Sequence, residues 1–246
     1  MPKFFVNQEN IKDGKIIITG ENVNHIKNVL RKNIKDTIEI CDAQNGKNFL
    51  CEISEFQKEQ IICDIAEELQ NTSEPKTYVH IYQGLPKADK MELIIQKSVE
   101  LGVSEITPIN MKRCIVKLDA KDEKKKIERW QKISEVAAKQ SGRDIIPKIN
   151  DICNIKDITK QCESYDSIIL AYENEKENTL KNEIQKLKKS KLNKIAIIIG
   201  PEGGVDLEEV EKAKQEGINI ITLGNRILRT ETVALNILSI IMYELE

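Results

Sequence analysis

A glycine-rich turn near the C-terminus is the first place where residue types and spacing suggest chemistry. Residues 194–199 read KIAIII, and Gly-Pro-Glu-Gly-Gly follows at once. Gly203 and Gly204 permit positive φ and let a ligand approach the backbone closely, while Pro201 stiffens the entry. No Lys-Ser or Lys-Thr pair follows, so this is not a nucleotide phosphate loop. The turn predicts either a ligand cradle of backbone amides or a purely structural tight turn.

A second glycine turn, LGNRILRTET at 223–232, ends the next expected strand. Arg226 and Arg229 stand just ahead of the last expected helix. Cations at a helix N-terminus oppose the helix dipole, at a cost of roughly 0.3–1 kcal/mol each. An anionic substrate would offset that cost, and so would an acidic neighbour such as Glu231. A structural Arg–Glu pair explains one of these arginines more easily than it explains both.

Positive charge is concentrated in two segments, although the whole chain has a net charge of −2. Residues 111–148 hold twelve Lys or Arg against six Asp or Glu, and residues 25–35 hold four basic residues and no acid. Such patches are candidate footprints for nucleic-acid phosphates. A charge run is more often a solvated helix face, and the sequence leaves both interpretations open.

The first 70 residues are expected to form a small β-barrel-like domain. They contain four short, Ile-rich stretches of strand character with Asp-Gly and Asn-Gly turns between strands, and a short helix is expected at 25–32. A polar stretch with one proline, residues 70–76, marks a boundary. We therefore expect one domain over residues 1–72 and a second over residues 73–246.

Strands and helices are expected to alternate from residue 77 onward. The expected strands are 78–85, 105–110, 167–173, 194–200 and 218–224. The expected helices are 89–102, 122–141, 179–190, 207–217 and 230–246. Within the fourth, Asp206 and Glu209 have the spacing of a capping box at its start. This alternation predicts an α/β fold, a parallel sheet with helices on both faces.

The last expected helix is apolar almost all round. A helix with so little polar face must be covered on more than one side. For the final element of the chain, this predicts burial in a subunit interface and hence a homodimer.

Several protein classes fit the sequence poorly. No apolar run approaches membrane-spanning length, and the N-terminus lacks the layout of a signal peptide. The six cysteines form no C-x-x-C pair and the chain has only two histidines, so no metal site is expected. A cytoplasmic location with reduced thiols is the simple interpretation.

The motifs together resemble one enzyme family. IIIGPEGGVDLEEV followed by LGNRILRTETVALN is similar to the double signature of the SPOUT methyltransferases. The sequence most resembles the bacterial 16S ribosomal RNA (uracil-N3)-methyltransferases. The resemblance extends to QGLPKADKMELIIQKSVELGVSEITPINMKRC, to AAKQSGRDIIP and to HIKNVLR in the N-terminal part.

This resemblance implies a fold, a cofactor and partners. The C-terminal domain would be a parallel sheet with a trefoil knot, and the N-terminal domain a PUA-like barrel that helps to grip RNA. The cofactor would be S-adenosylmethionine, and the substrate 16S ribosomal RNA of the small subunit. The family also dimerises through its C-terminal helices, in agreement with the apolar last helix.

The resemblance also implies site residues. The cofactor pocket would be lined by Leu170, Ile199, Gly200, Gly203, Gly204, Leu223, Gly224, Ile227, Leu228, Thr232 and Ala234. The RNA would contact Lys3, Lys27, Arg31, Lys87, Lys112, Arg113, Lys139 and Arg143.

The implied reaction is methyl transfer to N3 of a uracil, which must lose its proton. Arg229 would stabilise the negative charge that spreads onto the ring oxygens, and Glu231 would hold Arg229 or accept the proton. Two alternatives stay open. One is a SPOUT enzyme acting on a ribose 2′-hydroxyl or a tRNA base, and the other is a non-catalytic RNA-binding protein.

Overall fold

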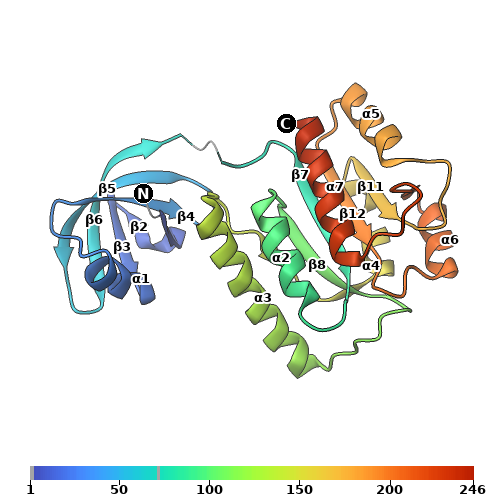
Figure 1. Ribbon diagram of the computed structural model, residues 1–246. Coiled ribbons are helices and arrows are strands. Elements are labelled where there is room, and N and C mark those ends of the chain that lie inside the picture. The colour runs from blue at the N-terminus through green and yellow to red at the C-terminus, as the bar shows by residue number, and fades with distance from the viewer. Residues whose placement is uncertain (1–2, 71–72) are drawn as a thin grey trace. The chain divides into compact units, whose positions relative to one another are not determined.

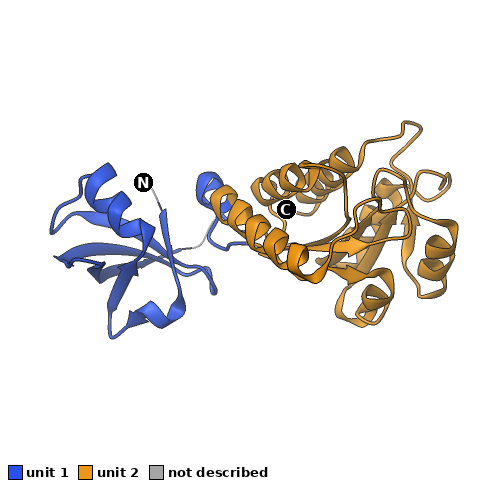
Figure 2. Cartoon of the chain, turned by 90° about the horizontal axis from the view of Figure 1, so that it is seen from below, with its two compact units in different colours: residues 1–74, 138–146 blue, residues 75–137, 147–246 orange. Residues whose placement is uncertain are grey.

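The structure is a computed structural model that describes residues 3–70 and 73–246. The chain divides into two compact units (Figure 2). Unit 1 comprises residues 1–74 with 138–146, and unit 2 comprises residues 75–137 with 147–246. The boundary expected between residues 72 and 73 falls where residues 71 and 72 lie outside the described part. The return of residues 138–146 to unit 1 was not anticipated from the sequence.

Unit 1 contains a six-stranded sheet with the order β1-β4-β5-β6-β3-β2. The strands are β1 (Lys3–Val6), β2 (Ile11–Lys12), β3 (Lys15–Thr19), β4 (Thr37–Asp42), β5 (Asn48–Phe56) and β6 (Gln60–Leu69). β1 pairs with β4 in parallel and the other pairs are antiparallel. Among the described residues, no ladder joins β1 to β2, so the barrel-like sheet stays open at this seam.

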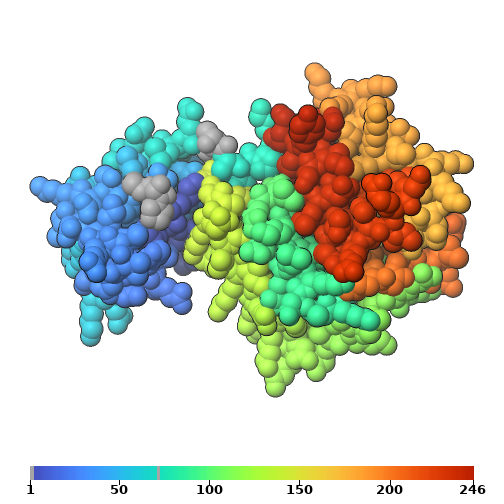
Figure 3. Space-filling view, viewed as in Figure 1, coloured from blue at the N-terminus to red at the C-terminus, as the bar shows by residue number. Residues whose placement is uncertain are grey.

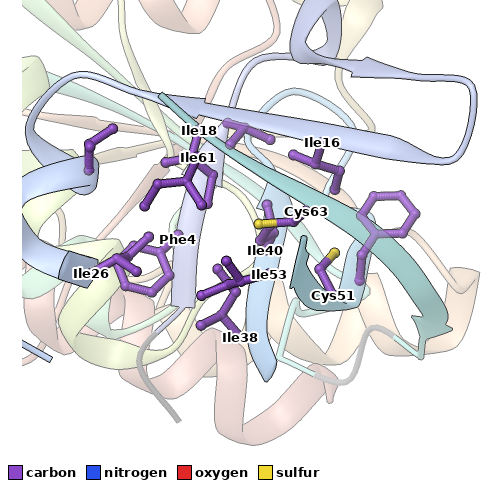
Figure 4. Packing of buried hydrophobic residues seen from close by; sticks show 13 residues of the cluster. Phe4, Ile16, Ile18, Ile26, Ile38, Ile40, Cys51, Ile53, Ile61 and Cys63 are labelled. Atoms are coloured by element: carbon purple, nitrogen blue, oxygen red, sulfur yellow. The ribbon is translucent and has the colours of Figure 1, made fainter. Parts of the chain in front are cut away.

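Isoleucine dominates the core of unit 1, as the low aromatic content requires (Figure 4). Strand residues at alternate positions, such as Ile16 and Ile18 on β3, point into one cluster with Phe4. η1 (Gln8–Asn10), α1 (Glu21–Asn24) and η2 (His25–Val29) are the short helical segments of this part of the unit. The helix expected at 25–32 thus begins and ends earlier, and its second half is a π-helix.

Unit 2 contains a parallel sheet with the order β10-β8-β7-β12-β11-β13, and β9 also pairs with β8. The strands are β7 (Tyr78–Gly84), β8 (Glu105–Asn110), β9 (Lys148–Ile149), β10 (Cys153–Asn154), β11 (Ser167–Ala171), β12 (Lys194–Ile199) and β13 (Asn219–Ile221). Five consecutive residues of β12, Ile195–Ile199, are buried. Both faces of the sheet are therefore covered, which confirms the expected α/β class.

The helices of unit 2 begin and end close to the expected positions. They are α2 (Lys90–Glu100), α3 (Ala120–Ser141), which ends in unit 1, α4 (Ile155–Thr159), η3 (Cys162–Ser164), α5 (Leu180–Ser190), α6 (Leu207–Gln215) and α7 (Thr230–Leu245). The capping box of Asp206 and Glu209 at the start of α6 is confirmed. α7 packs against α2, α5 and β12, and Figure 1 shows α7 beside α2 in front of the strands. β9, β10, α4 and η3 were not expected.

Candidate active site

Three neighbouring strands of unit 2 end at the same level of the sheet. Ala171, the last residue of β11, is in register with Ile199 of β12 on one side and with Ile221 of β13 on the other. Ligand sites of open α/β sheets lie beyond such carboxyl ends. The loops that follow the three strands enclose a cavity of about 920 Å³. The start of α7 and Lys90 complete its wall.

The two glycine turns that the sequence singled out both line this cavity. Gly204 has φ of 71°, and its amide donates to the Pro201 carbonyl at 2.9 Å to close the first turn. A Cβ on Gly204 would lie 2.3 Å from a carboxylate oxygen of Glu173. Gly224 in the second turn has φ of 100°, and a Cβ there would meet no atom within 4 Å. Both positions therefore favour glycine through backbone conformation, since the Glu173 carboxylate near Gly204 is the end of a flexible side chain that can move aside.

Close backbone packing holds the first turn against β7. A Cβ on Gly84 would lie 2.6 Å from the nitrogen of Pro201, so only glycine fits at the end of β7. Gly203 has a different constraint, because a Cβ there would lie 3.1 Å from the Cβ and the carbonyl oxygen of Arg113. The missing side chain of Gly203 thus makes room for the loop that follows β8, on the outer side of the turn.

Thr230, the first residue of α7, ties three elements together at the base of the cavity. Its hydroxyl donates to the Gly200 carbonyl at 2.7 Å and accepts from Nε2 of Gln83 at 2.8 Å. Both Gln83 and Thr230 are buried, and Thr230 lines the cavity. Sequence reasoning named Thr232 and missed Thr230. The sequence did contain a feature that points to Thr230, because a hydroxyl at the start of an almost wholly apolar helix is expected to be buried and then needs a hydrogen-bond partner.

Charged side chains stand around the cavity. Lys90 lies 3.0 Å from Glu202 and 3.5 Å from Glu231, and these carboxylates raise the pKa of Lys90, with the Glu202 hydrogen bond first. Burial raises the pKa of Glu202, but hydrogen bonds from its surroundings and from Lys90 bring it below its ordinary value. Glu231 thus pairs with Lys90. Arg229 is exposed, lines the cavity and makes no ion pair with any residue that the structure describes.

Most of the expected cofactor residues lie on the cavity wall. Those on the wall are Ile199, Gly200, Gly203, Gly204, Leu223, Gly224, Ile227 and Leu228. Leu170, Thr232 and Ala234 lie outside it. Leu170 and Ala234 are fully buried, and Thr232 is exposed. Chain neighbours line the cavity in their place, namely Ala171, Thr230 and Val233.

The expected RNA contacts divide into two groups. Lys27, Arg31 and Lys87 are exposed. The others are engaged or partly covered in this structure. Lys3 pairs with Asp144, Arg143 is 5% exposed with Nε 3.2 Å from Glu74, and Lys139 is half-buried.

Lys112 and Arg113, also expected to contact RNA, are exposed and lie against the first glycine turn and the start of α6. Nη1 of Arg113 donates to the Gly203 carbonyl at 3.2 Å, and Lys112 pairs with Glu208. Acidic residues on the cavity wall, Glu173 and Glu175, were also missed. The run AYENEKEN directly after a strand could have revealed them.

Among the residues that the structure describes, no group of three or more His, Cys, Asp or Glu could hold a metal ion. In residues 3–70 and 73–246, no helix is long and apolar enough to cross a membrane.

Comparison with known proteins decides the family. The sequence matches the RNA methyltransferase domain over residues 72–242 and the RNA methyltransferase PUA domain over residues 18–66. The chain belongs to the RNA methyltransferase family. It is 40% identical to ribosomal RNA small subunit methyltransferase E of Bacillus subtilis, over 93% of this chain and 90% of that protein. The protein of the same name from Mesomycoplasma hyopneumoniae is 37% identical, over 97% and 98%.

Solved structures of this family have the same fold. Ribosomal RNA small subunit methyltransferase E of Neisseria gonorrhoeae, bound to S-adenosyl methionine, has a TM-score of 0.82 at 28% identity and covers 98% of this chain and 96% of its own. A methyltransferase from Legionella pneumophila, in complex with the same cofactor, has a TM-score of 0.82 at 28% identity, over 98% and 97%. The enzyme class suggested by the two glycine turns is thereby confirmed.

Proposed function

We propose that this protein transfers a methyl group from S-adenosylmethionine to N3 of a uridine in 16S ribosomal RNA of the small subunit. The observation that carries the proposal is the cavity at three strand ends, lined by both glycine turns, in a chain whose structural relatives hold this cofactor. The names of its relatives support a substrate in the small subunit.

The residues present fit this cofactor. The cavity of about 920 Å³ lies within the range of ligand sites. Leu223, Ile227 and Leu228 offer apolar surface for an adenine ring, and the turns offer backbone donors and acceptors. Glu173 and Glu175 on the wall suit a ligand that carries ammonium and sulfonium charges. When bound, S-adenosylmethionine supplies an electrophilic methyl group.

The chain's own residues would assist the uracil. We propose Arg229 as the catalytic cation, because it lines the cavity at the start of α7 and has no carboxylate partner among the described residues. Its guanidinium would stabilise the negative charge that remains on the ring after N3 loses its proton. Glu231 is held by Lys90 at 3.5 Å, which favours a role in positioning Lys90 and the turn at Glu202.

N3 lies on the pairing edge of uracil, so the target base must be unpaired or flipped out. Lys27, Arg31 and Lys87 are exposed and are proposed phosphate contacts. The PUA domain match supports an RNA-binding role for unit 1. A ribosomal substrate would place the protein in the cytoplasm.

We further propose a trefoil knot in unit 2 and a homodimer. After β13 at the sheet edge, the chain returns through the second glycine turn, and α7 packs against β12 near the middle of the sheet. This course supports a knotted chain. α7 also lies along the surface of the unit (Figure 3), and Tyr243 on it is 86% exposed. An apolar helix with such a side chain uncovered favours a partner subunit.

The decisive experiment uses small ribosomal subunits from a strain that lacks this gene. They are incubated with the purified protein and isotopically labelled S-adenosylmethionine, and the RNA is digested for nucleoside mass spectrometry. Labelled 3-methyluridine is the expected product. A label on a 2′-O-methyl nucleoside would favour the other SPOUT reaction. Tight RNA binding without label would favour a non-catalytic protein.

A further inference from the structure

The loop between β8 and α3 lies against the outer side of the first glycine turn. Arg113 is its point of closest approach, since its Nη1 donates to the Gly203 carbonyl at 3.2 Å. A Cβ on Gly203 would lie only 3.1 Å from the Cβ and carbonyl oxygen of Arg113. The loop is itself closed by a hydrogen bond of 3.0 Å from the Cys114 amide to the Met111 carbonyl. The loop therefore packs closely against the side of the turn that faces away from the cavity.

The same loop holds the beginning of α6. The Lys112 amide donates to Oε1 of Glu209 at 3.0 Å, and the other oxygen of Glu209 accepts from the Asp206 amide at 3.3 Å. Glu209 is buried, so this carboxylate links the loop to the capping box. Nε of Arg113 and Nζ of Lys112 each lie 3.5 Å from Asp206. The turn is thus fixed at Gly203 and at Asp206, on either side of Gly204.

We propose that Arg113 is a positioning residue for the cofactor turn, an inference that rests on the proposed S-adenosylmethionine site. Gly203 and Gly204 line the cavity on one side of the turn, whereas Arg113 does not line it. Arg113 acts through the turn, because its guanidinium binds the Gly203 carbonyl and the Asp206 carboxylate at once. A basic residue expected to bind RNA phosphates serves the geometry of the cofactor wall.

The first test is Arg113→Ala, with S-adenosylmethionine binding measured by titration calorimetry. We expect Kd to rise about tenfold, as the loss of one charge-assisted hydrogen bond predicts. The KM for the cofactor should rise in parallel, with kcat within about twofold of the unaltered enzyme. Lys117→Ala is the matched control, because Lys117 is an exposed cation of the same connection, and it should leave Kd unchanged. Circular dichroism and a thermal melt check that each variant is folded.

The second test is Gly203→Ala. Its new methyl group would point at Arg113 and away from the cavity. If residue 203 acted only through its own contact with the cofactor, the substitution would leave the Kd unchanged. Positioning predicts weaker cofactor binding, because the turn and the Arg113 loop must separate by a few tenths of an ångström. Normal Kd in both Arg113→Ala and Gly203→Ala would overturn the proposal.

RNA binding separates positioning from direct phosphate contact. The logarithm of the RNA-binding constant falls linearly with the logarithm of the salt concentration, and the slope of this line counts phosphate contacts. Arg113→Ala should have the same slope as the unaltered protein, because the guanidinium is engaged by Gly203 and Asp206. A slope reduced by about one, together with unchanged cofactor Kd, would overturn the proposal in favour of an RNA contact. If the unaltered protein binds no S-adenosylmethionine, the proposed function itself fails. A loss of S-adenosylmethionine affinity in Arg113→Ala and Gly203→Ala, with normal affinity in the unaltered protein, supports the positioning role.

Discussion

Arg229 and Glu231 stand two residues apart at the start of α7 and have different surroundings. Glu231 is paired with Lys90, whereas Arg229 lines the cavity with its charge unpaired among the described residues. An unpaired cation beside the positive end of a helix is unfavourable by roughly 0.3–1 kcal/mol. Such a cost is expected of a cation whose partner is an anionic substrate, and it supports the different roles proposed for the two side chains.

Arg229→Ala is expected to reduce kcat by about 100-fold while S-adenosylmethionine binding stays within about twofold. The reason is that the guanidinium would stabilise charge on the uracil and not on the cofactor. Methylation assays and calorimetry on the same preparation measure both quantities. Arg226→Ala is the comparison, since Arg226 is the other exposed arginine of the second turn. Equal losses in the two variants would contradict a specific role for Arg229.

Thr230→Val is expected to lower the free energy of unfolding by about 1–3 kcal/mol, because the half-buried Gly200 carbonyl loses its donor and the buried Gln83 amide keeps only the Gly84 carbonyl as acceptor for its Nε2. Urea denaturation measures the change. Thr232→Val is the matched control on the same helix, and its exposed side chain predicts a change below about 0.5 kcal/mol. Equal destabilisation by the two substitutions would remove the special role of Thr230.

At the scale of secondary-structure elements, the neighbouring strands β7 and β8 share a buried polar network. His80 on β7 contacts the Tyr165 hydroxyl at 2.6 Å and the Thr107 hydroxyl of β8 at 2.8 Å. Burial lowers the pKa of His80 from 6.5 to about 4, against the opposing effect of Glu105. Because the folded chain binds the proton less readily than the unfolded chain, acid favours unfolding here.

Stability is therefore expected to fall as the pH drops from about 6.5 towards 4, the window between the unfolded and folded pKa values of His80. Between pH 7.5 and pH 5 the loss from this residue should be about 2 kcal/mol. Urea denaturation at both pH values compares the unaltered protein with His80→Gln and with His25→Gln. The pH dependence should shrink in the first variant and persist in the second. An unchanged dependence in His80→Gln would contradict this source of acid sensitivity.

Local signals predicted the elements and the position of the cavity well, because glycine, proline and capping residues act within a few positions. The two turns line one cavity because their strands, β12 and β13, flank β11 in the sheet. Helical phase was harder to predict, since two residues along a helix rotate the side chain by about 200°, which separates buried Thr230 from exposed Thr232. Strand order was beyond reach, because β12 reaches its place between β7 and β11 through long-range pairing.

The ion pairs of the charged residues could not be predicted for a related reason. Lys112, Arg113 and Arg143 look like surface cations in the sequence, but their partners lie far away along the chain. Arg113 finds Gly203 and Asp206, and Arg143 finds Glu74. No local pattern distinguishes a cation that will bind a phosphate from one that folding pairs with a distant carboxylate.

The whole molecule is expected to be a homodimer through α7. Tyr243→Asp would place a charge at the most exposed large hydrophobic side chain of that helix, and sedimentation velocity should then detect monomer at micromolar concentration. Glu211→Ala is a suitable control, because Glu211 lies on the exposed side of α6. Sedimentation of the unaltered protein as a monomer would contradict the expected dimer.

The chain leaves unit 2 and returns to it around residues 138–146, which complete unit 1. Asp144 in this segment is buried and accepts from Ser73 at 2.6 Å and from Lys3. The small unit is therefore not a module that a single cut can release. A fragment ending at residue 74 would lack residues 138–146, which belong to the same unit. Grafting this unit onto another enzyme would therefore require these nine residues as a second, separate insertion.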